Sequence, residues 1–164
     1  MALRDGNTNL INDYKDSTSI DLSGCKSLKN VDGLAKCTKL TKLDLSNCES
    51  LQNVDGLVNC TNLIELDLIG SSIQNVDKLA NCTKLTSLDL SACDSLQNVH
   101  GLANCTKLTK LDLSSSAPSW NFTPRRRLNV DGLVNCTNLT RLDLPRCESL
   151  ENVNGLAKCP NLTK

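Results

Sequence analysis

The chain has 164 residues, 39% of them hydrophobic and 2% aromatic. Its 18 acidic residues balance 18 basic residues, so no overall field attracts nucleic acid or an anionic membrane. No apolar run reaches the roughly 18 residues that suggest a membrane span, and the first residues lack the apolar core of a secretory signal. We therefore expect no membrane partner and no nucleic-acid partner.

The first segment in chain order, residues 1–16, precedes the regular part of the sequence. It carries Leu3, Leu10, Ile11 and Tyr14, which can share one face of a short element. We expect this segment to be an N-terminal cap that covers the first repeat.

A pattern close to Leu-Asp-Leu-Ser recurs six times over residues 17–161. The six copies begin at Ser17, Leu40, Leu63, Leu85, Leu108 and Leu139. Self-similarity at a fixed short period is the signature of a stacked repeat protein. A single copy buries too few apolar groups to offset the entropy of ordering its own residues. We therefore expect the copies to stabilise one another as neighbours in a solenoid.

Each copy predicts a strand followed by a tight turn. In the second copy, the alternation around Leu43 predicts a short strand with one buried face. Leu51, Val54 and Leu57 then follow in steps of three, which predicts a compact turn with its side chains pointing inward. The Asp55-Gly56 pair stands where an acidic N-cap would start a short helical turn.

The frame LxxLxL followed by Cys or Asn resembles the leucine-rich-repeat family over residues 17–161. The short copies and their LxxVxxL run resemble the type found in internalins and in a regulatory subunit of protein phosphatase 1. Most copies have CxxL where that type has NxI, and only Ser71-Ser72-Ile73 keeps the shorter spacing. The resemblance implies an α/β repeat fold: a right-handed solenoid with a concave parallel sheet and short helical or irregular convex turns. It also implies protein–protein recognition through the polar strand positions.

Ten cysteines follow the repeat in two columns. The first column comprises Cys25, Cys48, Cys93 and Cys147, and the second comprises Cys37, Cys60, Cys82, Cys105, Cys136 and Cys159. Column members on parallel rungs point the same way, which is poor geometry for disulfides, and no CxxC pair suggests a zinc site. We expect buried free thiols, no metal and a reducing compartment such as the cytoplasm.

Seven Asn-x-Ser/Thr matches would permit glycosylation in a secreted protein. Four of them are copies of Asn-Cys-Thr. Duplication of the repeat therefore explains these matches better than glycosylation does.

An acidic row is expected to line the polar face of the sheet, with basic side chains two residues earlier in three copies. Adjacent carboxylates repel one another and raise their own pKa values. The alternatives are solvated carboxylates, a docking strip for a basic peptide, and a chain of divalent cations. The candidate partner-binding residues on this face are Lys42, Asp44, Glu65, Asp67, Asp89, Lys110, Asp112, Arg141 and Asp143.

An insertion within residues 114–127 lengthens the fifth copy. Leu113 and Val130 enclose 16 residues, where Leu45 and Val54 enclose 8. Two prolines disfavour helix, so the segment should leave the solenoid as a loop. Its candidate partner-binding residues are Trp120, Phe122, Arg125, Arg126 and Arg127. The alternatives are a tolerated insertion whose Trp120 covers its own rung, a protein-binding loop, and a contact with single-stranded nucleic acid.

Other patterns argue against catalysis. His100 is the only histidine, and serine and aspartate occur only at repeated positions, so no unique catalytic constellation stands out. We expect neither an enzyme nor a cofactor.

Residues 162–164 open a seventh copy without a polar closing cap. The alternatives are a fragment of a longer array and self-association through the last rung.

The sequence therefore predicts a non-catalytic protein–protein interaction module that uses the concave face and the Trp120 loop. One alternative is a structural spacer or an engineered, consensus-like scaffold without its own ligand. Another is a pathogen protein that acts inside a host cell, by analogy alone.

Overall fold

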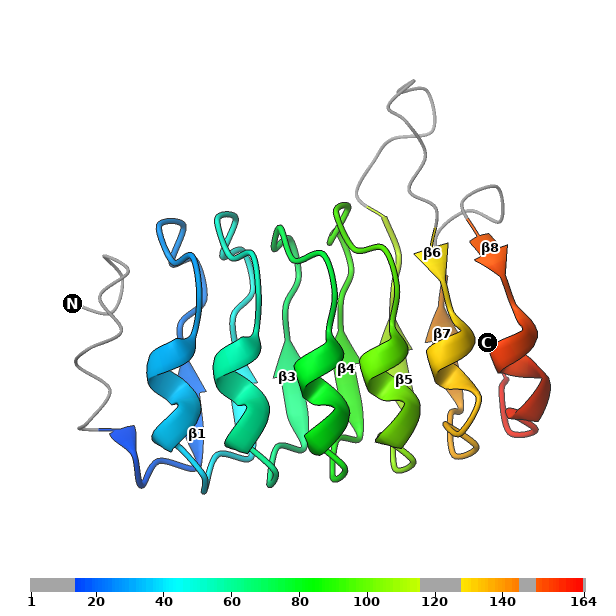
Figure 1. Cartoon of the computed structure of the whole chain (residues 1–164), viewed down its shortest axis with the longest axis horizontal. Coiled ribbons are helices and arrows are strands. Elements are labelled where there is room, and N and C mark those ends of the chain that lie inside the picture. The colour runs from blue at the N-terminus through cyan, green and yellow to red at the C-terminus, as the bar shows by residue number, and fades with distance from the viewer. Residues whose placement is uncertain (1–13, 116–127, 145–149, 164) are drawn as a thin grey trace.

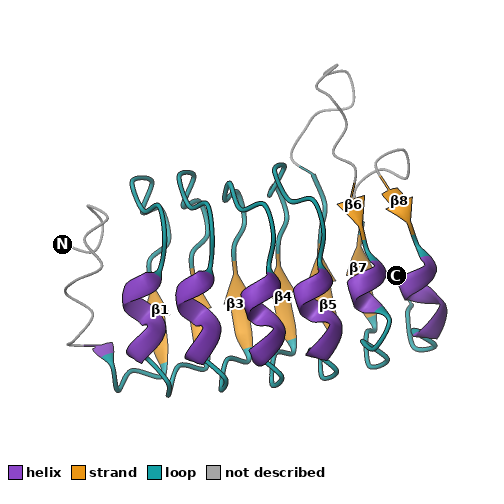
Figure 2. Ribbon diagram, in the orientation of Figure 1, coloured by secondary structure: helices purple, strands orange, loops and turns teal. Residues whose placement is uncertain are grey.

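A computed structural model of the chain describes residues 14–115, 128–144 and 150–163. Each of the six repeats, which we call rungs 1 to 6 in chain order, contributes a strand and a short 3-10 helix. The strands form one layer and the 3-10 helices another, with the core between them (Figures 1 and 2). The predicted leucine-rich-repeat solenoid is thereby confirmed.

The main sheet is parallel, in the order β1-β2-β3-β4-β5-β7. Its strands are β1 (Ser19–Asp21), β2 (Lys42–Asp44), β3 (Glu65–Asp67), β4 (Ser87–Asp89), β5 (Lys110–Asp112) and β7 (Arg141–Asp143). The central residue of each strand points inward, as Leu43 does, and pairs with its equivalent on the next rung. The buried leucines thus stack in one continuous core from Ile20 to Cys159.

The compact turns predicted opposite the sheet are 3-10 helices. They are η3 (Asp32–Lys36), η4 (Asp55–Asn59), η5 (Asp77–Asn81), η6 (His100–Asn104), η7 (Asp131–Leu133) and η9 (Asn154–Lys158). Each buries a central leucine or packs it against the core, as Leu57 shows at 0% exposure. Leu51, Val54 and Leu57 are all buried as predicted, but only Leu57 lies within the helix, because Val54 is its N-cap and Leu51 precedes it.

The predicted acidic N-cap is wrong. Val54 occupies the N-cap position of η4, and its side chain cannot cap. Asp55 is the first helical residue, and its amide donates to Oδ1 of Asn53 at 3.2 Å. The same Asn-to-amide bond occurs in all six rungs, for example from the Asp131 amide to Asn129 Oδ1 at 2.8 Å. Asparagine two positions earlier therefore satisfies an amide at the start of the helix.

Glycine follows the first helical residue in most rungs because the helices approach one another closely. A Cβ at Gly101 would lie 2.0 Å from the Val76 carbonyl oxygen, and one at Gly56 would lie 1.9 Å from that of Val31. Lys78 replaces this glycine in rung 3 and is exposed. Close stacking of backbones accounts for the Asp-Gly pairs.

A second, smaller parallel sheet joins the last two rungs, where the sequence predicted only turns. It consists of β6 (Leu128–Asn129) and β8 (Leu150–Asn152). A bridge from Asn98 to Asn129 extends its pairing to rung 4. In Figure 1 these strands lie above the 3-10 helices of their rungs.

The ends of the chain are described in part. Leu3, Leu10 and Ile11 lie outside the described residues, so the N-terminal cap stays a prediction. At the other end, the Thr163 amide donates to the Thr140 carbonyl at 3.0 Å, as the equivalent threonines do between earlier rungs. Within the described residues, no helix is long and apolar enough to cross a lipid bilayer.

Candidate functional site

Two rows of side chains project from the main sheet, opposite the core, and run across all six rungs. The acidic row comprises Asp21, Asp44, Asp67, Asp89, Asp112 and Asp143. The variable row comprises Ser19, Lys42, Glu65, Ser87, Lys110 and Arg141. Both rows are in register, so each member lies opposite its equivalent on the next strand. The nine predicted sheet residues therefore share one face.

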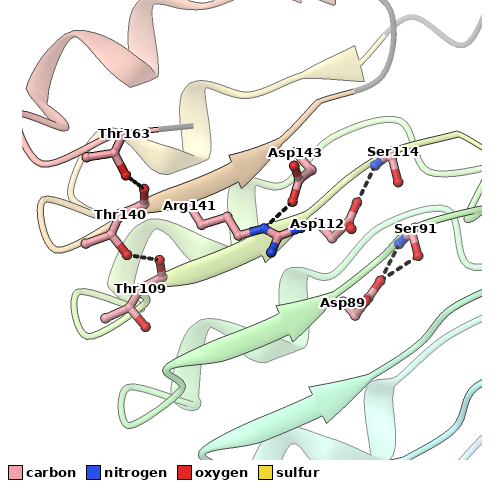
Figure 3. A network of polar contacts seen from close by, with 9 residues as sticks. All are labelled: Asp89, Ser91, Thr109, Asp112, Ser114, Thr140, Arg141, Asp143 and Thr163. Atoms are coloured by element: carbon pink, nitrogen blue, oxygen red, sulfur yellow. Dashed lines mark hydrogen bonds and ion pairs between the residues drawn. The ribbon is translucent and has the colours of Figure 1, made fainter.

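The acidic row is held by the turn that follows each strand. The Asp44 carboxylate accepts a hydrogen bond from the Ser46 amide at 2.9 Å. Asp89 accepts from both the amide and the hydroxyl of Ser91, at 2.9 and 2.6 Å (Figure 3). These bonds fix the side-chain positions and terminate the strand, so the repeated aspartate has a structural task in every rung where they form.

Asp143 differs because Pro145 stands at the position of the donating residue. Proline has no N–H to donate. Asp143 instead accepts a hydrogen bond from Arg141 Nε at 2.6 Å, within its own strand (Figure 3). This contact raises the pKa of Arg141, with smaller contributions from the charges of Asp112 and Asp89. In the sequence, the proline that replaces serine after Leu-Asp-Leu in rung 6 already indicated that Asp143 lacks this backbone donor.

The predicted mutual repulsion of the carboxylates is visible at Asp67. Burial raises the pKa of this half-buried carboxyl, and the charges of Asp44 and Asp89 raise it further. The hydrogen bond from the Ile69 amide and the charge of Lys42 act in the opposite direction. The net shift of the Asp67 pKa is upward, with burial as its largest cause.

Basic side chains of the variable row offset part of this charge. Lys42 Nζ lies 2.9 Å from a Glu65 carboxylate oxygen on the next strand, and both side chains are more than half exposed. The pKa of Lys42 rises mainly through this contact, with smaller contributions from Asp44 and Asp67. Lys42 is therefore paired with Glu65 within the variable row, and the aspartates Asp44 and Asp67 affect its pKa less.

A threonine column stiffens the edge of the face where the strands begin. The Thr109 hydroxyl donates to the Thr86 carbonyl at 3.0 Å, and Thr140 and Thr163 repeat the contact with their preceding rungs (Figure 3). Ile64 replaces threonine in rung 3 and keeps only the backbone bond, to the Thr41 carbonyl at 2.7 Å.

The insertion cannot be placed on this surface. Trp120, Phe122, Arg125, Arg126 and Arg127 lie outside the described residues, so their role stays a prediction.

The cysteine columns serve the interior and not the face. The nine cysteines in the described part of the chain are buried and form no disulfide, and Cys147 lies outside that part. The Cys48 thiol donates to the Leu22 carbonyl of the preceding rung at 3.2 Å, and Cys60 donates to Leu34 at 3.5 Å. Burial raises the pKa of Cys60 to about 12, so this thiol is no nucleophile at neutral pH.

The asparagines of the Asn-Cys-Thr copies also link rungs. Asn59 Nδ2 donates to the Ala35 carbonyl at 3.2 Å, and Asn81 Nδ2 donates to Val58 at 3.1 Å. Asn104 and Asn135 repeat this contact with their preceding rungs. The amide nitrogen is thus used within the fold, which gives the duplicated tripeptide a structural reason. No cluster of three or more potential metal ligands occurs among the described residues.

Comparison with known proteins identifies the repeat type. A family model described as the endo-β-N-acetylglucosaminidase EndoS leucine-rich-repeat domain matches residues 6–116. No curated protein sequence gives a significant match.

Solved structures with a similar fold include an internalin and a type III effector domain. The internalin InlF of Listeria monocytogenes has a TM-score of 0.51 and 20% identity, and the alignment covers 88% of this chain and 45% of that one. The leucine-rich-repeat domain of the type III effector XopL has a TM-score of 0.56 and 17% identity, with coverage of 95% and 66%. At such identities the likeness concerns the fold alone. Because the family model matches more than half of its length, the chain belongs to the leucine-rich-repeat family of the EndoS-domain type.

Proposed function

We propose that the chain is a non-catalytic recognition module that binds a protein or peptide through the main sheet. Leucine-rich-repeat proteins commonly mediate protein–protein interactions. The observation that carries the proposal is the contrast between the two rows on this face. The acidic row is uniform and tied to the backbone, whereas the variable row changes from Ser to Lys to Glu between adjacent strands.

The variable row is also accessible. The side chains of Lys42, Glu65 and Arg141 are 60%, 52% and 59% exposed. Because these residues extend from regular strands of a solenoid, their spacing is set by the sheet and not by a mobile loop. Rigid placement of exposed polar groups lowers the entropic cost of binding. The face therefore offers a preorganised, rung-specific pattern of charges.

Selection of random peptides against the full chain tests this proposal. Each selected peptide is titrated against the Glu65→Lys variant and against the matched Asp55→Lys variant, in which the exposed acidic residue lies on η4, in the layer opposite the sheet. We expect Glu65→Lys to weaken binding about tenfold or more, and Asp55→Lys to leave the dissociation constant unchanged. Peptides that bind both variants as they bind the original chain would place binding outside the sheet face, and a selection that yields no specific peptide would favour a structural spacer.

The proposal includes a contribution from the insertion. Trp120 is the only tryptophan, so its emission reports any change around this segment during the same titrations. We expect Trp120→Ala to weaken binding of those peptides that alter the emission. Equal affinities for the variant and the original chain would remove the insertion from the binding surface.

We also propose a reducing compartment, because buried cysteines without disulfides occur in all six described rungs. Thiol counting on denatured protein from its native source is expected to find all ten cysteines reduced. A count of two or fewer free thiols would contradict this placement.

A further inference from the structure

Rung 3 departs from its neighbours at the two positions that flank its strand: one before β3, at the edge of the face, and one after it. In the column that follows the strands, Ser46, Ser91 and Ser114 are serines, but rung 3 has Ile69. In the threonine column that precedes the strands, rung 3 has Ile64. This rung is also one residue shorter than rungs 1, 2 and 4. Two apolar side chains therefore flank β3 where polar ones flank β2 and β4.

Both isoleucines are accessible. Ile64 is 39% exposed, and Ile69 is half-buried at the end of the strand. Burial alternates along Leu66, Asp67, Leu68 and Ile69, so Ile69 projects on the same side as Asp67. Exposed apolar side chains contribute favourable free energy when apolar groups of a partner cover them and exclude water. Their separation along an extended strand is about 16 Å, from roughly 3.3 Å per residue over five residues.

The charge between these two isoleucines is negative. Glu65 and Asp67 lie between them, and rung 4 contributes Ser87 and Asp89 on the same face. Rung 4 adds no basic side chain to the two rows, whereas Lys42 of rung 2 pairs with Glu65. The pKa of Asp67 is raised by its burial and by both neighbouring aspartates, so a cation placed here would meet carboxylates that repel one another. Over all described strands the two rows hold seven acidic and three basic side chains.

We propose that rung 3 is the anchor point of the sheet face and receives an extended protein segment with a basic centre and an apolar residue near each end. The apolar residues pack on Ile64 and Ile69, and the basic residues lie over Glu65, Asp67 and Asp89. This inference rests on the proposed function, because it names the partner chemistry for the same face.

The test uses variants that copy neighbouring rungs. Ile64→Thr and Ile69→Ser introduce the residues found in rungs 2 and 4, so the fold is retained, as thermal unfolding checks. Val153→Thr is the control, because Val153 is 50% exposed but lies next to η9, in the opposite layer. The probe is a labelled peptide, Gly-Leu-Ser-Lys-Ser-Lys-Ser-Leu-Gly, in which the alternation of an extended strand places both leucines and both lysines on one side. Its binding is followed by fluorescence anisotropy. Two comparison peptides replace both leucines with serine, or both lysines with glutamate.

The expected result is saturable binding of the leucine–lysine peptide, weakened about tenfold by each isoleucine variant and unchanged by Val153→Thr. Added salt should also weaken it, because exposed charges are screened. Equal binding of the serine peptide, no binding of the probe, or indifference to Ile64→Thr and Ile69→Ser would overturn the inference.

The peptides selected at random separate the two proposals. If they depend on Glu65 but ignore both isoleucine variants, the sheet face binds partners and the anchor at rung 3 is wrong. If they ignore Glu65 as well, both proposals fail.

Discussion

Asp67 lies directly opposite Asp89 on the adjacent parallel strand, and Asp44 lies opposite Asp67 on the other side. Like charges in such positions destabilise a sheet by about 0.2–1 kcal/mol. Burial is the largest cause of the raised pKa of Asp67, and the charges of Asp44 and Asp89 raise this pKa further. The hydrogen bond from the Ile69 amide, at 3.0 Å, needs only an acceptor and not a charge.

Asp67→Asn is therefore expected to stabilise the protein at neutral pH by a few tenths of a kcal/mol, up to about 1. A carboxyl whose pKa is higher in the folded state favours folding when protonated, and this contribution is lost as the pH rises through the folded pKa. The advantage of the variant should thus disappear near pH 3, below the ordinary pKa of about 3.9. Urea unfolding at both pH values measures it.

The control for that experiment is Asp143→Asn. Asp143 contacts Arg141, so loss of its charge should stabilise nothing and cost at most about 1 kcal/mol, as for an exposed pair. Equal stabilisation by both variants would show that the gain does not come from repulsion within the row.

The buried thiols predict a loss of stability in alkali. Burial raises the pKa of Cys60 and Cys105 to about 12, and that of Cys48, Cys82 and Cys136 to about 11. These thiols stay protonated in the folded chain while the unfolded chain ionises, so their full contribution holds below about pH 8. Above it, each should cost about 1.4 kcal/mol per pH unit until its folded pKa is reached.

Denaturant titrations between pH 7 and pH 11 measure this slope. Cys60→Ala should reduce it, whereas Thr61→Ala, at the exposed neighbour, should not. An identical slope for Cys60→Ala and the original chain would show that the thiol does not titrate with unfolding.

Two equivalent residues in the turn after the strand, Gly70 in rung 3 and Ala92 in rung 4, should respond oppositely when alanine and glycine are exchanged. Gly70 has φ of 69°, and Ala92 occupies the same left-handed conformation with φ of 56°. A side chain there costs about 1–2 kcal/mol, partly offset by the entropy that glycine loses on folding. We expect Ala92→Gly to stabilise by about 0.5 kcal/mol and Gly70→Ala to destabilise by about 1. The nearest atom to a Cβ at Gly70 is Asn47 Oδ1 at 3.4 Å, so a loss there would report backbone conformation and not a clash. Unfolding midpoints of the same sign would refute this account.

Because Asn53 and not Asp55 satisfies the first amide of η4, the two residues should differ in their contribution to stability. Asn53→Ala removes the acceptor of the Asp55 amide and should cost about 1 kcal/mol, as for loss of a cap. Asp55→Ala changes an exposed side chain that makes no capping bond and should stay within about 0.5 kcal/mol. Chemical denaturation of the two variants compares them, and a larger loss for Asp55→Ala would restore the acidic cap.

The periodic pattern was sufficient to predict the solenoid, because strand alternation and stacked leucines repeat too regularly to fit another fold. It also predicted that the thiols form no disulfides, since stacked side chains point the same way. It could not choose between Asn53 and Asp55 as the capping residue, because both types accept from backbone amides. The close approach at Gly101 was missed because it involves the Val76 carbonyl of another rung, and spacing within one repeat does not reveal it.

The candidate face was predicted more completely than its contacts. The alternation placed all nine residues on one side, but the direction of Lys42 towards Glu65 depends on side-chain rotamers across two strands. The small sheet of β6 and β8 was missed because its residues follow the pattern of the other turns. What differs there is the pairing between the last rungs, which a local pattern does not contain.

The buried thiols, which donate hydrogen bonds to carbonyls of the preceding rung, can report local opening of each rung. Cys48 and Cys60 react with an alkylating reagent only when their level of the stack opens, because each is sealed by the rung before it. Labelling rates read cysteine by cysteine would therefore chart how opening spreads along the array. They would also show whether a peptide bound to the main sheet slows the local opening of the rungs that it contacts. No engineered label is needed, because the cysteines belong to the sequence itself.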